Sequence, residues 1–158
     1  MTEKLPLRKN CEGYFLDGKG NILAKKSDGG QIIFPGGGVN EGETPEKGLL
    51  REAHEETGVV IKGKLKKLRT LTILWDKDWI TSKKQRNRYK KFKGDKMYFY
   101  KGKIDKIEKP KIKDEDYWKG KKLIPIREAI NDIENKKPFN KSIKKYREIQ
   151  LKFIKSFL

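Results

Sequence analysis

Three glutamates stand close together in this sequence at a spacing that suits metal chemistry. Glu52, Glu55 and Glu56 occupy positions i, i+3 and i+4, so a helix through them would project all three carboxylates from one face. Like charges at that spacing repel one another, and a bound cation would relieve the repulsion. Several carboxylate oxygens on a rigid helix, with waters completing the shell, suit Mg²⁺ or Mn²⁺. The alternative interpretation is a solvated acidic helix face.

The flanking residues predict the helix and the loop that would position these carboxylates. Thr44-Pro45 is typical of an N-cap followed by proline at the first helical position, and Gly58 suits a helix C-terminus. The helix is therefore expected at about 45–57, with close packing at its interior Gly48. Before it, Pro35-Gly36-Gly37-Gly38 is expected to end regular structure and to let the backbone closely approach another backbone segment or a ligand.

Taken together, residues 37–59 resemble the signature of the Nudix hydrolases. That signature asks for glycine, five residues, glutamate, seven residues, then Arg-Glu, an aliphatic residue, any residue, Glu-Glu, any residue, glycine and an aliphatic residue. The chain has Gly37, Glu43 and then Arg51-Glu52-Ala53-His54-Glu55-Glu56-Thr57-Gly58-Val59 at those spacings. The preceding Phe34-Pro35-Gly36 is also similar to the usual lead-in of the family.

The resemblance implies a role for each matching residue. The metal ligands would be Glu52, Glu55, Glu56 and the carbonyl of Gly36. Glu43 and Arg51 would pair and brace the helix, which fixes the geometry of the metal ligands. Gly37 and Gly58 would be needed for their backbone conformation. His54 stands at an unspecified position and is expected on the helix surface.

The activity implied is metal-dependent hydrolysis of a diphosphate linkage. Mg²⁺, with Mn²⁺ as a substitute, would neutralise and orient the diphosphate and lower the pKa of a bound water that attacks phosphorus. We expect Glu56 to be the general base. The alternatives are the acidic residues Asp114, Glu115 and Asp116, although that run also suits a simple turn before Tyr117-Trp118.

The rest of the chain predicts an α/β fold. A hairpin is expected at 12–26, a short strand at 31–34, further strands at 63–75 and 96–106, and further helices at about 125–134 and 142–158. The segment 76–95 is either a long loop or a helical insertion. With the resemblance, these elements imply a Nudix-type α/β/α sandwich with a mixed sheet and a loop–helix–loop catalytic motif.

Composition limits the other possibilities. The 158 residues suit a single domain over 1–158. One cysteine, Cys11, allows no disulfide within the chain, and a single histidine allows no zinc site of the usual kind. We find no signal peptide or membrane-spanning run, so the sequence predicts a cytoplasmic protein without a membrane partner, either a monomer or a homodimer.

The substrate is less constrained by the sequence. The formal net charge of +18 attracts polyanions, but only seven of the 40 basic residues are arginine, so lysine bias explains it equally well. A nucleoside triphosphate or other small nucleotide is the first expectation, with Arg86, Arg88 and Trp75 as candidate contacts. Trp79 and Trp118 are further candidates for stacking on a base, with at least one tryptophan in the core.

Two alternatives stay open. The basic segment mixes cations with aromatic side chains, as surfaces that follow a nucleic-acid strand do, so the enzyme could be an RNA 5′-pyrophosphohydrolase or a decapping-type enzyme. A non-catalytic module that binds nucleotide or RNA is the third possibility. It is disfavoured because no carboxylate of the signature is missing.

Overall fold

The sheet is organised around β1, Leu7–Leu16, in the computed structural model, which describes residues 5–27, 30–109, 118, 122–136 and 141–158. β1 pairs in parallel with β7 (Gly94–Ile107), from Leu7 opposite Gly94 to Leu16 opposite Lys103. On its other side β1 pairs antiparallel with β5 (Gly36–Gly38) and β2 (Asn21–Leu23). The strand order is β6-β7-β1-β2-β8, with β6 at Val59–Leu74 and β8 at Leu123–Pro125. β3 (Lys25–Lys26) and β4 (Ile32–Ile33) form a separate pair.

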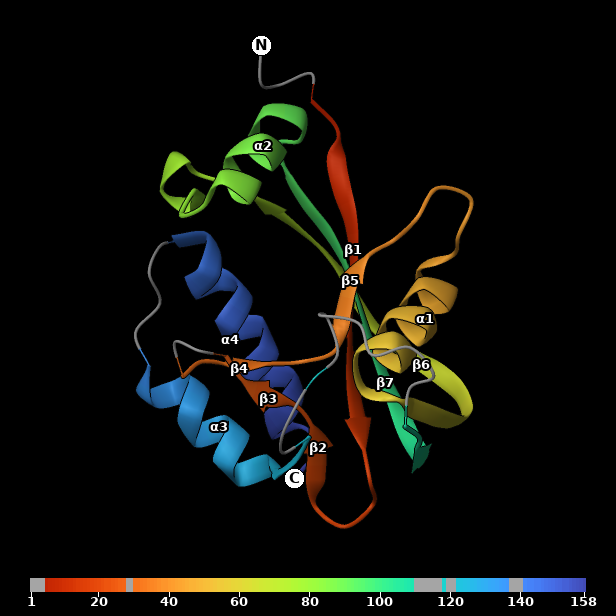
Figure 1. The fold of residues 1–158 in the computed structure, drawn as a ribbon. Helices are drawn as coiled ribbons and strands as arrows, with labels where there is room; N and C mark the ends of the chain where they lie inside the picture. The colour runs from red at the N-terminus through yellow and green to blue at the C-terminus, as the bar shows by residue number, and fades with distance from the viewer. Residues whose placement is uncertain (1–4, 28–29, 110–117, 119–121, 137–140) are drawn as a thin grey trace.

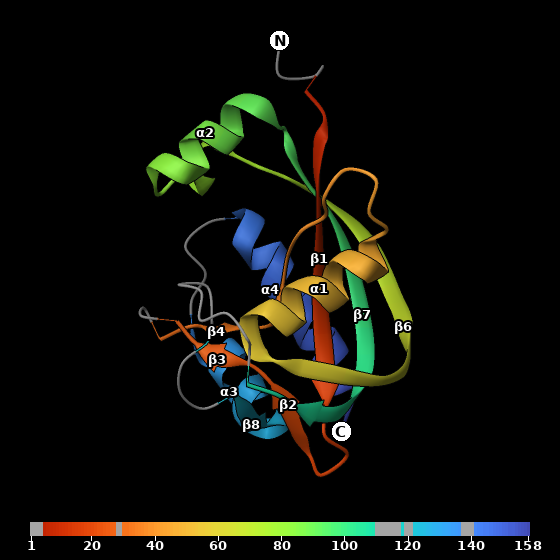
Figure 2. The same ribbon diagram turned by 45° about the vertical axis from the view of Figure 1, so that its right-hand side comes forward.

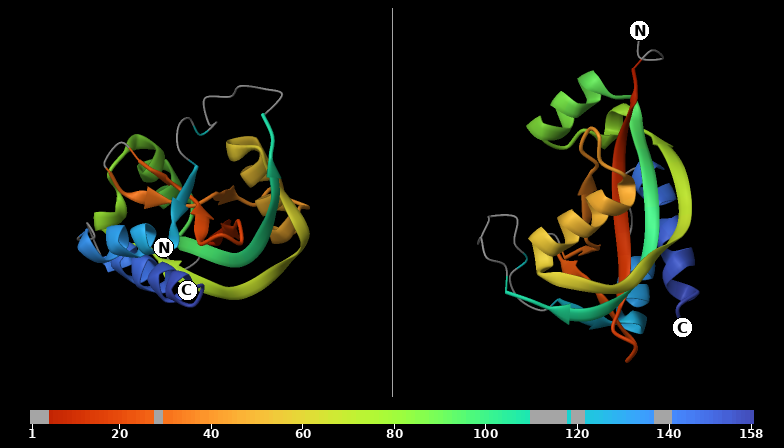
Figure 3. Two further views of the ribbon diagram at one scale, coloured as in Figure 1. Left: turned by 90° about the horizontal axis from the view of Figure 1, so that it is seen from below. Right: turned by 90° about the vertical axis from the view of Figure 1, so that its right-hand side faces the viewer.

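Helices cover both faces of this sheet. α1 (Pro45–Thr57) lies on one face, and α3 (Ile126–Asn135) and α4 (Lys141–Lys155) lie on the other (Figures 2 and 3). One core cluster, which includes Cys11, Phe15 and Leu49, fills the space under α1. The larger cluster, which includes Tyr14 and Phe99, fills the space under α3 and α4. This arrangement confirms the predicted α/β/α sandwich with a mixed sheet. None of the described helices is long and apolar enough to cross a membrane.

The predicted helix over 45–57 is confirmed at both ends. The Thr44 side chain accepts a hydrogen bond from the Lys47 amide at 3.2 Å, and Gly58 ends the helix in the left-handed conformation with φ 79°. The predicted packing at Gly48 is also confirmed, because a Cβ there would lie 2.9 Å from Glu43 Oε1. The cap residues act locally, so the sequence was sufficient to place this element.

The prediction that the glycines after Pro35 end regular structure was wrong. Gly36–Gly38 form β5, with Gly36, Gly37 and Gly38 opposite Glu12, Cys11 and Asn10 of β1. A Cβ on Gly36 would lie 2.1 Å from the Cys11 carbonyl oxygen. The glycines are therefore compatible with a strand whose backbone approaches its neighbour more closely than any side chain would allow.

The segment between β6 and β7 is a helical insertion. It begins with a 3₁₀ turn, Lys77–Trp79, and continues as α2, Lys83–Lys91, which stands at one end of the sheet (Figure 1). Ser82 caps α2 by accepting a hydrogen bond from the Gln85 amide at 3.1 Å. The sequence left open whether this segment is a loop or a helix, and the capped helix decides it.

A buried carboxylate joins β1 to α4. Glu12 accepts hydrogen bonds from the Tyr14 hydroxyl at 2.6 Å and the Gln150 amide nitrogen at 3.0 Å, and the Tyr146 hydroxyl also donates to it. Burial raises the pKa of Glu12 above its ordinary value, although these three donors and nearby Arg147 favour the charged form. The network ties the N-terminal strand to the C-terminal helix.

We expect the contribution of Glu12 to the stability of the folded state to decrease as pH rises. Its pKa is higher in the folded than in the unfolded chain, so its contribution is fully present below pH 4.5 and is lost as pH rises through the folded pKa. We expect the free energy of unfolding of the wild type, relative to Glu12→Gln, to fall with increasing pH in urea titrations. The difference between the two proteins cancels the other titrating groups. A difference that grows with pH would mean that the three donors outweigh burial.

Candidate functional site

The signature glutamates occupy one side of α1 with different degrees of exposure. The side chains of Glu52 and Glu55 are 24% and 58% exposed, whereas Glu56 is turned towards the sheet. His54 lies on the helix surface, as expected, with Nε2 3.4 Å from Glu108 Oε2. α1 therefore presents carboxylates that range from solvated to largely buried within little more than one turn.

Arg51 connects these carboxylates to the loop before the helix. Its Nε and Nη2 donate to the two carboxylate oxygens of Glu43 at 2.9 and 3.1 Å, a bidentate pair. Nη1 lies 3.2 Å from Glu52 Oε1 and 3.3 Å from Glu55 Oε2. Nη2 also donates to the Gly38 carbonyl at 3.4 Å. One guanidinium thus fixes the loop, the end of β5 and two of the glutamates relative to one another.

Glu56 is held by the backbone of β5 and by a tryptophan. Its Oε1 accepts from the Gly36 amide at 3.1 Å, and its Oε2 accepts from Trp118 Nε1 at 3.2 Å. Burial raises the pKa of Glu56 to about 8, and the charge of Glu52 also raises it, against the two hydrogen bonds and Lys25, which lower it. With this raised pKa, Glu56 is largely protonated at neutral pH when no cation is bound.

Gly37 leaves room for the carboxylate of Glu52. A Cβ on Gly37 would lie 2.8 Å from Glu52 Cδ. The Gly37 carbonyl accepts from Cys11 Sγ at 3.3 Å, and burial raises the pKa of that thiol to about 12. Cys11 is therefore a neutral packing residue under α1.

The chemistry of these side chains fits a hard divalent cation. Three carboxylates project from neighbouring turns, and Glu52 already penalises the charged form of Glu56, so a cation between them would relieve that repulsion. In their present rotamers, no three acidic, histidine or cysteine side chains of the described residues converge closely enough to hold an ion. Binding would therefore require the carboxylates to turn away from Arg51 and Trp118.

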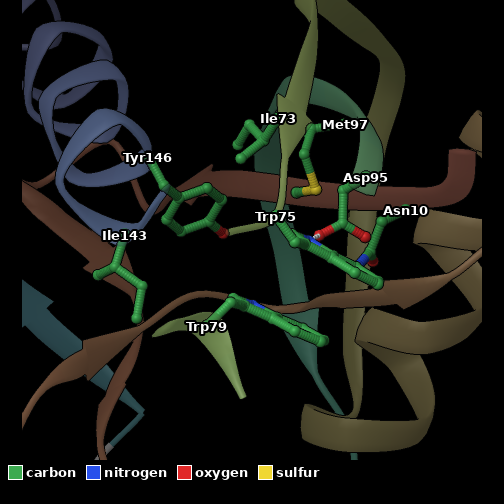
Figure 4. Close-up of a pocket in the computed structure, with 8 residues that line it drawn as sticks. All are labelled: Asn10, Ile73, Trp75, Trp79, Asp95, Met97, Ile143 and Tyr146. Atoms are coloured by element: carbon green, nitrogen blue, oxygen red, sulfur yellow. Dashed lines mark hydrogen bonds between the residues drawn. The ribbon is translucent and has the colours of Figure 1, made fainter. Parts of the chain in front are cut away.

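An aromatic pocket of about 200 Å³ lies on the α4 side of the sheet (Figure 4). Its lining residues are Asn10, Ile73, Trp75, Trp79, Asp95, Met97, Ile143 and Tyr146. The rings of Trp75 and Trp79 are stacked, with centroids 3.8 Å apart and planes 4° from parallel. Trp75 Nε1 donates to Asp95 Oδ2 at 2.9 Å, which fixes the orientation of its ring. Aromatic walls with a few polar groups are typical of sites for small planar ligands.

The glycine strand β5 adjoins both the pocket and the carboxylates. Asn10, which lines the pocket, is opposite Gly38 in the β1–β5 ladder. The next pair, Cys11 and Gly37, faces α1 and Glu52. Because β5 carries no side chains, a ligand that crosses its edge would meet only backbone between the two.

The structure brings together some of the candidate substrate contacts and separates others. Trp75 lines the pocket, and Arg88 is half-buried beside Arg8 and Asp95. Arg86 is exposed on α2. Trp118 is buried against Glu56 rather than in the pocket. The alternative general bases Asp114, Glu115 and Asp116 lie outside the described residues.

Sequence reasoning missed several residues at this site. Asn10, Asp95 and Tyr146 line the pocket, and Trp118 binds Glu56, but none of them belongs to a local motif. Alternation along β1 is the one available signal. It places Asn10 on the same face as Glu12, opposite to Cys11.

Comparison with known proteins decides the family. A model described as NUDIX domain matches residues 11–146. The chain belongs to the NUDIX family. The match spans most of the chain and includes the second half of β1, the signature helix and the start of α4. The predicted family membership is therefore confirmed.

Individual relatives resemble shorter parts of this NUDIX chain or only its fold. RNA pyrophosphohydrolases of Actinobacillus succinogenes and Mannheimia succiniciproducens are 50% and 45% identical over 42 residues, which is 26% of this chain. The match spans 21% of the length of each of these relatives. A MutT NUDIX hydrolase from Burkholderia pseudomallei has a TM-score of 0.52 at 17% identity, covering 89% of this chain and 95% of that one. This likeness confirms the predicted Nudix-type fold.

Arg51→Lys should weaken metal binding although it keeps the charge. Lysine lacks the planar fork that ties α1 to Glu43 and to the Gly38 carbonyl, so the helix would lose its alignment with β5. We expect the affinity for Mn²⁺, measured by EPR of the free ion, to fall by about 10–100-fold. Arg127→Lys, at an exposed position on α3, is the matched control. Unchanged Mn²⁺ affinity in a folded Arg51→Lys protein would show that Arg51 does not position the carboxylates for metal binding.

Proposed function

We propose that this NUDIX protein hydrolyses a diphosphate linkage in a nucleoside triphosphate or a related small nucleotide, with Mg²⁺ as cofactor and Mn²⁺ as its substitute. The observation that carries the proposal is the position of β5. Its glycines contact Glu52 and Glu56 of α1, and the same strand adjoins the aromatic pocket through Asn10. A diphosphate site and a site for a planar base would then lie on either side of one backbone strand.

Different residues of the chain would bind the metal and position its ligands. Glu52, Glu55 and Glu56, with the carbonyl of Gly36, would hold the metal ions, which when bound neutralise the diphosphate and activate a water. Arg51 would keep the carboxylates in register with the loop. Water oxygen would attack one phosphorus, the P–O bond of the anhydride would break, and the water would lose its proton to a base.

Glu56 is the preferred general base for this step. Its carboxylate lies against the Gly36 amide of β5, beside the proposed diphosphate site. Asp114, Glu115 and Asp116 stay as alternatives.

The pocket favours a single planar base as the group attached to the diphosphate. At about 200 Å³ it is smaller than the pockets of about 300–1,000 Å³ that hold larger ligands. Trp75 and Trp79, stacked on each other, form an aromatic wall of the pocket, and Asn10 and Asp95 offer polar atoms for the edge of a base. These features support a nucleotide rather than an aliphatic diphosphate.

An RNA 5′ end is the second candidate substrate. Two relatives named RNA pyrophosphohydrolase share 45–50% identity with this chain over 42 residues. The insertion supports it, because Lys83–Lys91 places many basic side chains on one short helix at the end of the sheet (Figure 1). In this case Arg86, exposed on α2, would contact the RNA backbone.

Glutamine substitutions at Glu52 and Glu55 test the hydrolase proposal. Each change removes one charged metal ligand at a position that is at least partly exposed, so the fold should survive. Release of phosphate and nucleotide is measured with Mg²⁺ over a panel of nucleoside triphosphates, dinucleotides and 5′-triphosphorylated RNA. We expect kcat to fall on the order of 10²-fold or more. Glu148→Gln, an exposed residue of α4, is the matched control.

Two outcomes would contradict the proposal. Full activity in Glu55→Gln and Glu52→Gln would remove these residues from the metal site. No turnover of any substrate by the wild type would favour a binding module.

The RNA alternative makes a separate prediction about salt. If the RNA backbone contacts α2, kcat/KM for 5′-triphosphorylated RNA should exceed that for nucleoside triphosphates and fall steeply with salt concentration. Arg86→Gln should then reduce the magnitude of the slope of log(kcat/KM) against log salt concentration by about one, because one phosphate contact is lost. Hydrolysis of nucleoside triphosphates should not change. An equal salt dependence for Arg86→Gln and wild type would exclude Arg86 as an RNA contact.

A further inference from the structure

A half-buried cluster of charges beside the aromatic pocket contains two guanidiniums and one carboxylate. Arg8 of β1 lies with Nη1 3.8 Å from Asp95 Oδ1, and these side chains are only 20% and 15% exposed. Arg88 of α2 is close enough for both Arg8 and Asp95 to affect its pKa. Asp95 Oδ2 also accepts a hydrogen bond from the indole nitrogen of Trp75. One carboxylate therefore faces two cations.

The two arginines and the one aspartate leave a net positive charge at a half-buried position, where solvent screens it poorly. Burial, followed by the repulsion of Arg8, lowers the pKa of Arg88 below its ordinary value, and Asp95 offsets this only in part. Guanidiniums stay protonated in proteins, so the excess charge persists. A phosphate group placed between the two guanidiniums would accept hydrogen bonds from them and would neutralise this charge.

The position of Arg8 links the pocket to the carboxylates. A Cβ on Gly38 would lie 2.9 Å from Arg8 Nη2, so the guanidinium of Arg8 stands over the end of β5. Arg51 reaches the same residue, donating to the Gly38 carbonyl at 3.4 Å. Asp95, the partner of Arg8, lines the pocket. Arg8 thus lies between the proposed base site and the proposed diphosphate site.

We propose that Arg8 and Arg88 together bind one phosphate group of a nucleoside 5′-triphosphate whose base occupies the pocket of Trp75 and Trp79. This inference rests on the proposed function and names the residues that would recognise its substrate. The phosphate chain would extend from the pocket past Arg8 and over Gly38 towards Glu52 and the other glutamates. Arg88 would give the helical insertion a part in binding a mononucleotide.

Binding without metal separates this inference from the hydrolysis. ATP and GTP, and the matching nucleosides adenosine and guanosine, are titrated in EDTA while tryptophan fluorescence is followed. The measured quantity is the ratio of triphosphate to nucleoside affinity. We expect Arg8→Gln and Arg88→Gln each to reduce this ratio by about tenfold, because each removes charged hydrogen bonds to the phosphate. Nucleoside affinity should not change, because neither arginine lines the pocket.

Two further variants make the test specific. Arg127→Gln on α3, which lies away from α2 in Figure 1, should leave the ratio unchanged. Asp95→Asn keeps an acceptor for Trp75 and removes the charge that competes for the arginines, so it should raise the ratio several-fold. A folding defect would not produce tighter binding. The double variant of Arg8 and Arg88 should lose less than the product of the single losses, since both bind the same phosphate.

Several results would overturn the inference. These are an unchanged ratio in Arg8→Gln and Arg88→Gln, equal weakening of nucleoside and triphosphate, or no binding of either ligand to the wild type. A loss confined to 5′-triphosphorylated RNA would assign the cluster to RNA instead, and so would also overturn it. Tighter binding of triphosphates that depends on both arginines, together with no hydrolysis in Mg²⁺, would support this phosphate site while contradicting the proposed function.

Discussion

The close pairing of β5 with β1 is the contact on which the candidate site depends. Gly36 approaches Cys11 so closely that no side chain could be accommodated, and this brings the β5 backbone within reach of α1. The Gly36 amide then binds Glu56, the Gly38 carbonyl binds Arg51, and Gly37 leaves space for Glu52. Without that approach, Glu56 would lose its backbone donor on β5 and Arg51 would lose its acceptor at Gly38.

Arg51 and Trp118 stabilise the three carboxylates that lie close together on α1. Like charges at i, i+3 and i+4 destabilise an isolated helix, and Glu52 raises the pKa of Glu56. Arg51 offsets part of this repulsion through Glu52 and Glu55, and Trp118 supplies a hydrogen bond to Glu56. The carboxylates are thus held in fixed orientations by contacts that a bound cation would have to replace.

The sequence was sufficient for features that depend on local chemistry. The ends of α1 follow from Thr44 and Gly58, and the spacing of the glutamates follows from the helical repeat. The strand at 36–38 was missed because three glycines usually mark a turn, and only the backbone of β1 makes a strand of them.

Other features depend on partners that are distant in the sequence. The parallel pairing of β1 with β7 brings Arg8 next to Asp95, and α4 adds Tyr146 to the pocket. Glu12 is buried because Gln150 and two tyrosines satisfy it, and no local pattern reveals that. The signature glutamates could therefore be found from sequence, whereas the pocket and the arginine pair required the fold.

A crystal structure with Mn²⁺ and a methylene-bridged nucleoside triphosphate analogue would test the central claim most directly. We expect anomalous peaks for Mn²⁺ in contact with the carboxylate oxygens of Glu52, Glu55 and Glu56. We also expect the base of the analogue to stack in the pocket of Trp75. Anomalous peaks away from α1, or an analogue bound elsewhere on the molecule, would contradict the account.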